Sequence, residues 1–262
     1  MDERSSNKSS LLEKLVPVLL LSSVVLAFFV GMLWQKVQNL ENGGSQVAGA
    51  ATTASAAPAV TVTMDQIKGL FSKNVVKFGD ASKKLIIVEI ADPSCPWCHV
   101  AGGLDPQLYS QMGVASNFDA PVPELRKLVD AGKASFVWIF YPGHGNGEMG
   151  AKALYCANEV GKFWAVHDLL MSNAGYTLMN TTVQNDKTKS GTVADFLKSA
   201  EDPKTMKSCL DSGKYEATLT DDTNLAQTLG ITGTPGFFLN TTSFPGAVDY
   251  SQMKSAVDAA LK

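Results

Sequence analysis

Two cysteines separated by two residues are the part of this sequence best suited to chemistry. Cys95 and Cys98 stand in the stretch VEIADPSCPWCHVAGG, with His99 directly after them. The spacing fits four kinds of site: a redox dithiol, a haem attachment site of the C-x-x-C-H form, half of a zinc site, or a structural disulfide. The neighbouring residues discriminate among these sites.

The residues around the cysteines predict that Cys95 begins a helix. The apolar run LIIVEIA (residues 85–91) predicts a buried strand, the Asp-Pro after it predicts a turn, and Pro96 suits the first turn of a helix. Free N–H groups and the helix dipole at such a position favour an anion, so we expect a lowered pKa for Cys95. Cys98, one turn deeper, should be more buried and less acidic. This asymmetry makes Cys95 the nucleophile that forms a mixed disulfide and Cys98 the residue that resolves it.

Glu89 is an acid in the middle of the same apolar run. Alternation against its apolar neighbours predicts that it is buried, and a buried carboxylate near Cys98 could take and return a proton. A solvent-facing position on an edge strand stays open as the alternative, because alternation over so few residues is weak evidence.

The other three kinds of site explain the motif less well. Haem attachment normally needs a distal ligand as well, and this motif follows a strongly β strand, so His99 is more simply a helix residue beside the dithiol. Zinc would need a second ligand pair, but Cys156 and Cys209 have neither CxxC spacing nor an adjacent histidine. A disulfide across two residues closes a small loop and adds little stability. We therefore expect a redox dithiol, with no metal and no organic cofactor.

At this point the sequence resembles a known family. VEIADPSCPWC together with GITGTPGFFLN (residues 230–240) is similar to the DsbA-like branch of the thioredoxin superfamily, whose members are often anchored at the membrane of bacteria. Glu89 matches the buried strand acid of that family, and Thr234-Pro235 matches its cis-proline loop, which faces the dithiol. The resemblance covers roughly residues 75–262. It implies a thioredoxin fold, of the α/β class, with a helical insertion at about 145–228.

The resemblance also implies roles for the residues around the dithiol. We expect five residues to bind substrate or to tune the reactivity of the cysteines: Pro96, Trp97, His99, Thr234 and Pro235. A cis X-Pro bond beside the cysteines would offer an extended backbone edge to which a substrate peptide pairs. An ordinary trans proline that opens a strand is the alternative.

Cys156 and Cys209 fall in helices of the expected insertion. The resemblance suggests that they bond to each other and clamp the helical part, with a stabilisation of about 3–5 kcal/mol for a loop of that length. A second redox pair that relays electrons is the alternative, although nothing around either residue suggests an acidified thiol.

One segment departs from the family pattern. Gly102 and Gly103 are poor helix formers and predict an early end or kink in the helix after Cys98. The following residues, to about Pro123, could shape a substrate groove or form a surface loop. We favour the loop, because irregular segments lie on the surface by default.

The rest of the folded part alternates helices and strands. Thr63 and Gln66 have the spacing of a capping box, which predicts a short helix over 63–71. The remaining patterns predict strands over 135–143, 236–240 and 246–250, and helices over 150–172 (broken near Gly161), 192–200, 202–217, 219–230 and 251–261. This order describes an α/β domain with a helical insertion.

The N-terminal part of the chain predicts a single transmembrane helix. Residues 15–34 contain no charge over twenty positions, a length that spans a bilayer. Basic residues are more frequent before this run than after it, which places residues 1–14 in the cytoplasm and the remainder outside. Residues 35–59 are rich in Ala, Gly, Ser and Thr and predict a flexible linker to a folded domain at 60–262.

A cleaved signal peptide is the competing interpretation of the same run, and it would make the protein secreted. The small residues of QVAGA (46–50) offer a cleavage site. We favour an uncleaved anchor, because the apolar run is longer than a typical signal-peptide core and this site lies more than ten residues beyond its end.

The composition narrows the class of partner. The chain has 262 residues, 22 basic against 25 acidic and a net charge of −3, and no basic cluster that would favour nucleic acid. Its four cysteines are an even number, as expected where disulfides persist. The sequence therefore predicts a thiol–disulfide oxidoreductase outside the cytoplasm that forms disulfides in unfolded or reduced exported proteins and exchanges electrons with a membrane redox partner. A reductase or isomerase with the same site, and a tethered peptide-binding chaperone module, remain alternatives.

Overall fold

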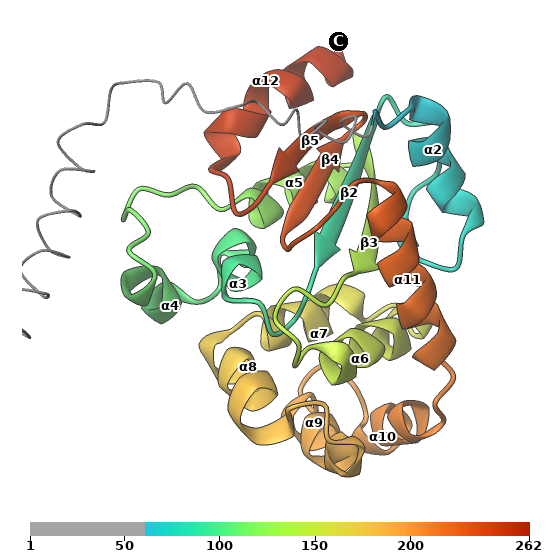
Figure 1. The fold of residues 1–262 in the computed structure, drawn as a ribbon, viewed down its shortest axis with the longest axis vertical. Helices are drawn as coiled ribbons and strands as arrows, with labels where there is room; N and C mark the ends of the chain where they lie inside the picture. The colour runs from blue at the N-terminus through green and yellow to red at the C-terminus, as the bar shows by residue number, and fades with distance from the viewer. Residues whose placement is uncertain (1–60) are drawn as a thin grey trace, which may run out of the picture. The chain divides into compact units, whose positions relative to one another are not determined.

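A five-stranded mixed sheet is the centre of the fold (Figure 1). The computed structural model describes residues 61–262. The strand order is β1-β3-β2-β4-β5, in which β2 and β3 are parallel and the other neighbouring pairs are antiparallel. The strands are β1 (Val76–Phe78), β2 (Leu85–Ala91), β3 (Ala134–Phe140), β4 (Gly236–Leu239) and β5 (Thr242–Pro245).

The two parallel strands form the interior of the sheet. Every residue of β2 and of β3 is buried. Both strands have near-continuous apolar sequences because helices cover both faces of the sheet, and this is why their positions could be predicted. The edge strand β1 was not predicted, because three residues are too few to show alternation.

Helices cover the sheet on both sides. On one face α2 (Met64–Gly69) and α11 (Glu216–Thr228) pack against the even-numbered residues of β2. On the other face lie α3 (Pro96–Gly102), α5 (Pro121–Asp130) and α12 (Tyr250–Leu261). The odd-numbered residues of β2 therefore lie under α3, the helix that carries the dithiol motif.

The chain between β3 and β4 is largely helical, as the sequence predicted. A helix break at Gly161, where φ is +70°, separates the first two helices of this insertion, and Asp202 caps the helix that begins at Pro203. The elements before α11 are α6 (Glu148–Glu159), α7 (Phe163–Leu170), α8 (Asn173–Thr177), the π-helix η2 (Leu178–Val183), the 3-10 helix η3 (Lys187–Lys189), α9 (Ser190–Phe196) and α10 (Pro203–Asp211).

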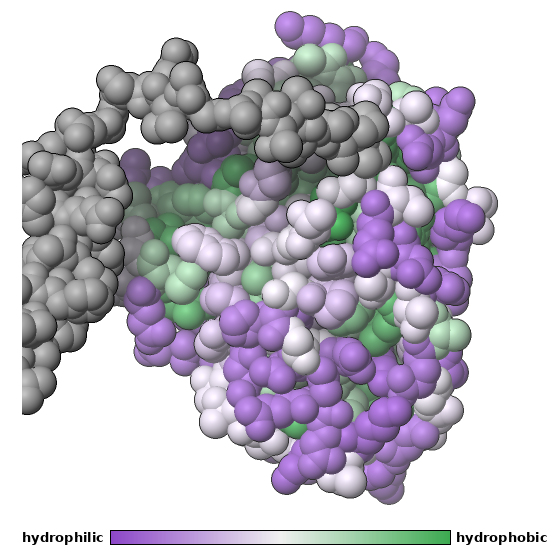
Figure 2. Space-filling model, in the orientation of Figure 1, coloured by the Kyte–Doolittle hydropathy of each residue, from purple (hydrophilic) through white to green (hydrophobic). Residues whose placement is uncertain are grey.

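The hydropathy of the surface differs between the helical insertion and the middle of the face shown in Figure 2. Figure 2 shows a mainly hydrophilic surface at the bottom of this face, where α9 and α10 lie in Figure 1. White and green residues, which are less hydrophilic, gather over the middle of the same face, where α3 lies in Figure 1.

Two of the sequence predictions on local structure are wrong. Residues 246–250 are not a strand. The chain turns back at Asn240, where φ is 54°, and the strand that pairs with β4 is β5, which ends at Pro245, before this segment. The segment after Gly103 is more than a surface loop: it contains the helix α4 (Pro106–Gln111), which buries Leu108 and begins at the buried cap Asp105. The predicted early helix end is correct, since Gly103 terminates α3 with a φ of +73°.

Within residues 61–262, no helix is long and apolar enough to cross a bilayer. The predicted transmembrane helix at 15–34, together with the segments at 1–14 and 35–59, lies outside the described residues.

Candidate active site

Cys95 is the cap residue at the start of α3. The strand β2 ends at Ala91, and a tight turn, in which the N–H of Cys95 donates to the carbonyl of Asp92 at 2.9 Å, leads directly into the helix. Pro96 occupies the first helical position, where a missing N–H costs little. Cys95 and Cys98 are both free thiols, so the structure describes the reduced dithiol.

The two cysteines have opposite electrostatic surroundings. A hydrogen bond from Cys98, followed by hydrogen bonds from Thr234 and from the backbone N–H groups of Cys98 and Trp97, lowers the pKa of Cys95 to about 6, although burial opposes this effect. Burial, and then the neighbouring Cys95, raise the pKa of Cys98 well above its ordinary value. Cys95 also keeps more exposed surface, 4% against 1% for Cys98. Cys95 is therefore both the more acidic thiol and the more accessible one.

The loop before β4 brings Thr234 and Pro235 to the dithiol. The Thr234–Pro235 peptide bond is cis. The thiol of Cys95 lies 3.4 Å from the carbonyl oxygen of Thr234. The Thr234 hydroxyl is buried without a partner in the thiol form, so it is free to donate to a Cys95 thiolate. Gly143 makes room for this hydroxyl, because a Cβ at that position would lie 1.8 Å from Thr234 Oγ1.

Glu89 is buried in the middle of the sheet, so the edge-strand alternative is wrong. It pairs with Trp138 of β3 on one side and with Phe237 of β4 on the other, and only 1% of its surface is exposed. Burial raises the pKa of Glu89 to about 7, and the charge of His167 opposes this rise. Its oxygen Oε2 has no hydrogen-bond partner. Because Glu89 lies on the face of β2 that packs under α3, its carboxyl group is on the same side of the sheet as Cys98.

His99 is a buried structural residue beside the dithiol. Its two ring nitrogens lie 3.0 Å from the carbonyl oxygen of Met171 and 2.9 Å from that of Pro93. Burial lowers the pKa of His99, while these two carbonyl groups oppose that effect. The ring thus connects the turn before Cys95 to the end of α7. Since both nitrogens already face backbone oxygens, His99 offers no free ligand atom for a haem iron.

Trp97 is the exposed apolar residue between the cysteines, with 42% of its surface accessible. It lies two residues after Cys95 and presents an exposed aromatic surface on the first turn of α3.

A group of polar residues that no sequence pattern predicted holds the turn before Cys95. The carboxylate of Asp92 accepts hydrogen bonds from the N–H and the hydroxyl of Ser94, both at 2.7 Å. Asn180 donates to the carbonyl of Ser94 at 3.0 Å and is itself linked to Asn146 at 3.2 Å. Asn180 belongs to the π-helix η2, and π-helical turns occur frequently at functional sites. No local pattern in the sequence connects Asn180 with Ser94, because 86 positions separate them.

Cys156 and Cys209 are joined by a disulfide, the pairing that the resemblance suggested. The bond connects α6 to α10 within the helical insertion, and its Cα atoms are 6.0 Å apart. The structure therefore places this pair in the insertion as a bonded cystine, separate from the free thiols of Cys95 and Cys98.

The fold and the dithiol together define a class of protein. A CxxC pair at the start of a helix, a cis proline against the first sulfur and a buried acid in the adjacent strand form the arrangement of a thiol–disulfide oxidoreductase. A family model described as Thioredoxin matches residues 118–259, more than half of the chain. The chain belongs to the thioredoxin family, as a DsbA-like member of that superfamily.

The chain is also similar to known proteins and to a solved structure. The chain is 24% identical over 193 residues to Disulfide bond formation protein D of Bacillus subtilis, covering 70% of this chain and 76% of that protein. A crystal structure of oxidised BdbD from Bacillus subtilis has the same fold, with a TM-score of 0.54, 22% identity, and coverage of 71% of this chain and 92% of that one. A Na(+)/H(+) antiporter, NhaA 3 of Salinispora tropica, is 28% identical over 70% of this chain, which spans only 24% of the antiporter.

Proposed function

We propose that this protein forms disulfide bonds in exported proteins, with Cys95–Cys98 as the oxidant. The observation that carries the proposal is the pKa of Cys95, which the surrounding hydrogen bonds lower from 9.0 to about 6. At neutral pH such a thiol is mainly a thiolate, and a stabilised thiolate favours the reduced dithiol. A dithiol that is stable when reduced is a good oxidant when it forms a disulfide.

The reaction would proceed by two exchanges. A substrate thiolate attacks the sulfur of Cys95 in the Cys95–Cys98 disulfide, so a substrate–Cys95 disulfide forms and Cys98 leaves as a thiolate. Glu89 donates a proton to Cys98, a role suited to a carboxyl group with a pKa of about 7. A second substrate thiolate then attacks the substrate sulfur, and Cys95 leaves as the stabilised thiolate.

The substrate would be an unfolded or reduced protein rather than a small molecule. Trp97 offers an exposed aromatic surface beside the nucleophile, and the backbone before Pro235 offers an edge for an extended peptide. The similarity to Disulfide bond formation protein D supports the same direction of reaction. Reoxidation of the dithiol would fall to a membrane redox partner.

The location that fits this activity is outside the cytoplasm, with the chain anchored by residues 15–34. The charge distribution around that run supports the orientation, and disulfides persist in this compartment. Mild reduction of intact cells followed by a membrane-impermeant thiol reagent tests it: we expect modification of Cys95 in a membrane fraction. Labelling only after lysis would refute the orientation, whereas labelled protein in the medium would indicate signal cleavage.

A reductase or isomerase that uses the same cysteines has one observation in its favour. A pKa of about 6 for Cys95 lies closer to the thioredoxin value of about 7 than to the DsbA value of about 3.5. The reduction potential therefore decides between the two directions of the reaction.

The deciding experiment is equilibration of the dithiol with glutathione buffers. We expect a reduction potential less negative than about −200 mV, on the DsbA side of the scale. A value near that of thioredoxin, about −270 mV, would refute the oxidase and favour the reductase. A Cys95→Ser variant separates both enzymes from a chaperone module, because it should lose thiol exchange, whereas a chaperone would keep its peptide binding and its effect on aggregation.

A further inference from the structure

Glu89 needs a path for its proton, because its carboxyl group is sealed from solvent. It is 1% exposed and lies between two neighbouring strands under α3. In the proposed reaction a substrate protein covers Cys95 at the moment when Cys98 requires a proton. A path to solvent along the substrate side of the dithiol is then closed, so the proton must be replaced from another direction.

His167 is the titratable group whose charge acts on Glu89. Burial raises the pKa of Glu89, and His167 is the neighbour that lowers it. His167 belongs to α7, is 1% exposed, and its Nε2 has no hydrogen-bond partner. Trp138, the register partner of Glu89, also has a buried ring nitrogen without a partner. Glu89 and Trp138 lie on the sheet face that α7 covers, so three unpartnered polar atoms share one side of the sheet.

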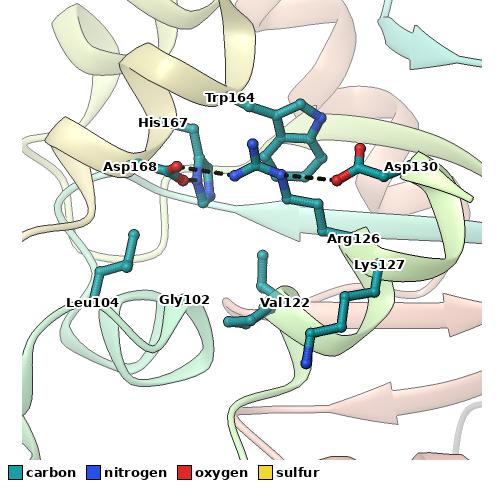
Figure 3. Close-up of a pocket in the computed structure, with 10 residues that line it drawn as sticks. Gly102, Leu104, Val122, Arg126, Lys127, Asp130, Trp164, His167 and Asp168 are labelled. Carbon is teal, nitrogen blue, oxygen red and sulfur yellow. Dashed lines mark hydrogen bonds and ion pairs between the residues drawn. The ribbon is translucent and has the colours of Figure 1, made fainter.

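The other nitrogen of His167 leads to solvent. Nδ1 lies 3.1 Å from a carboxylate oxygen of Asp168, whose side chain is 43% exposed and pairs with Arg126 at 2.9 Å. His167 and Asp168 line a cavity of about 280 Å³, in which Arg126 lies over the ring of Trp164 (Figure 3).

This cavity opens at the end of α3 that is remote from the nucleophile. Its walls include Gly102 and Leu104, at the C-terminal end of the helix, whereas Cys95 and Trp97 are at the N-terminal end. A protein bound at Cys95 would therefore leave the cavity open to water.

We propose that His167 carries protons between Glu89 and this cavity, so that the dithiol exchanges protons with solvent on the side away from the substrate. The proposal rests on the proposed role of Glu89 in the oxidoreductase. When Cys98 leaves as a thiolate, Glu89 gives it a proton and becomes a carboxylate. His167 then passes a proton to Glu89 from one side of its ring and takes a proton from water in the cavity on the other side. The sequence runs in reverse when the dithiol is reoxidised, and no electrons move in these steps.

His167 acts through Glu89 and does not contact the reacting sulfur atoms. It is therefore a positioning residue, which supplies Glu89 with its proton. An imidazole suits this task because its two nitrogens allow a proton to enter on one side of the ring and leave on the other. The charged and titratable groups that surround it are Asp168 from its own helix, Glu89 from β2, His99 from α3, and Arg126, Lys127 and Asp130 from α5.

The test is stopped-flow measurement of mixed-disulfide formation and release between pH 5.5 and 9, with the full chain and a cysteine peptide as substrate. In His167→Ala we expect the rate of the Cys98 step to fall at least tenfold, with the reduction potential and the pKa of Cys95 unchanged. Imidazole added to this variant should restore the rate, because it fits the space left beside the cavity. Pyrrole, which has the same shape but no basic nitrogen, should not restore it.

Two further variants make the outcome decisive. Val166→Ala, on the same buried helix, removes side-chain volume without removing a titratable group and should leave the pH profile unchanged. His167→Gln preserves most of the packing if the alanine variant does not fold, and it should show the same loss of rate. In this variant the NMR-measured pKa of Glu89 should rise, because the charge that lowers it is gone.

The proposal and the role of Glu89 can fail separately. A normal rate and pH profile in His167→Ala or His167→Gln, or equal rescue by pyrrole, would overturn the proton path through His167. If Glu89→Gln is slow while both His167 variants are normal, only the path is wrong. If Glu89→Gln is itself normal, the proposed function of Glu89 is wrong as well.

Discussion

The hydroxyl group of Thr234 gives the most direct test of how the site acidifies Cys95. In Thr234→Val a methyl group of nearly equal size replaces the hydroxyl, so the cis peptide and the carbonyl at 3.4 Å from the Cys95 sulfur stay in place. Only one thing changes: the thiolate loses a hydrogen-bond donor that has no other buried partner. The variant therefore isolates the contribution of one donor to the low pKa.

The size of the effect follows from the pKa. The donors, after the opposing effect of burial, lower the pKa of Cys95 from 9.0 to about 6, a net effect of about 4 kcal/mol at 1.36 kcal/mol for each pKa unit. A hydrogen bond to a charged group contributes about 1.5–3 kcal/mol, so its loss raises the pKa by about one unit or more. At pH 7 the thiolate fraction then falls from about nine-tenths to about half. The reduced form loses about 1 kcal/mol of stabilisation, and the potential becomes more negative by about 20 mV.

Thiolate absorbance near 240 nm, followed as a function of pH, measures the pKa, and glutathione equilibration measures the potential. Thr242→Val, an exposed position of β5, is the matched control and should change neither value. A pKa of Cys95 that is unchanged in Thr234→Val would refute the assignment of the hydroxyl as a donor to the thiolate. A raised pKa with an unchanged potential would refute the link between thiolate stability and oxidising power.

Three further predictions concern stability and the turn before the dithiol. Below pH 4.5, its ordinary pKa, Glu89 is neutral in both the folded and the unfolded protein. Above its folded pKa of about 7, the buried carboxylate lowers the free energy of unfolding by about 3 kcal/mol. Glu89→Gln should therefore stabilise the protein in urea titrations at pH 8 and not at pH 4. The Cys156–Cys209 disulfide spans 53 positions, so Cys156→Ala with Cys209→Ala should lower the free energy of unfolding by about 4 kcal/mol; a simultaneous change in the reduction potential of the dithiol would contradict its separate role. Asn180→Ala removes the hydrogen bond to the carbonyl of Ser94 and should cost about 1 kcal/mol of stability and slow thiol exchange; an unchanged exchange rate would show that this bond does not position the turn.

The sequence was sufficient to predict those parts of the fold that depend on local patterns. Residues 85–91 form β2 with the predicted bounds because an apolar run between two helical layers has few alternatives. The capping box of Thr63 and Gln66, the break at Gly161 and the end of α3 at Gly103 are each determined by residues within one helical turn. Local chemistry therefore specified where these elements begin and end.

Contacts between distant segments were predictable only through the family resemblance, or not at all. Thr234 lies 139 positions from Cys95, and no periodicity connects them. Asn180 reaches Ser94 through a π-helical turn that the sequence pattern did not predict. No local pattern in the sequence points to His167, since its effect on Glu89 depends on how α7 lies against the sheet. Tertiary packing, rather than local sequence preference, places these groups.

The cost of burying polar atoms explains where the functional part of this domain lies. Among residues 61–262, four buried side-chain atoms lack a hydrogen-bond partner, and they belong to Glu89, Trp138, His167 and Thr234. Each such atom costs about 1–3 kcal/mol compared with a satisfied group, and an apolar side chain of similar size would avoid that cost. One of these atoms lies beside the nucleophile, and the other three share the side of the sheet that faces the dithiol helix. A titratable group whose hydrogen bonds are all made in one protonation state resists changing to the other. Unpartnered polar groups that reduce stability are therefore expected near a reactive pair whose chemistry moves protons.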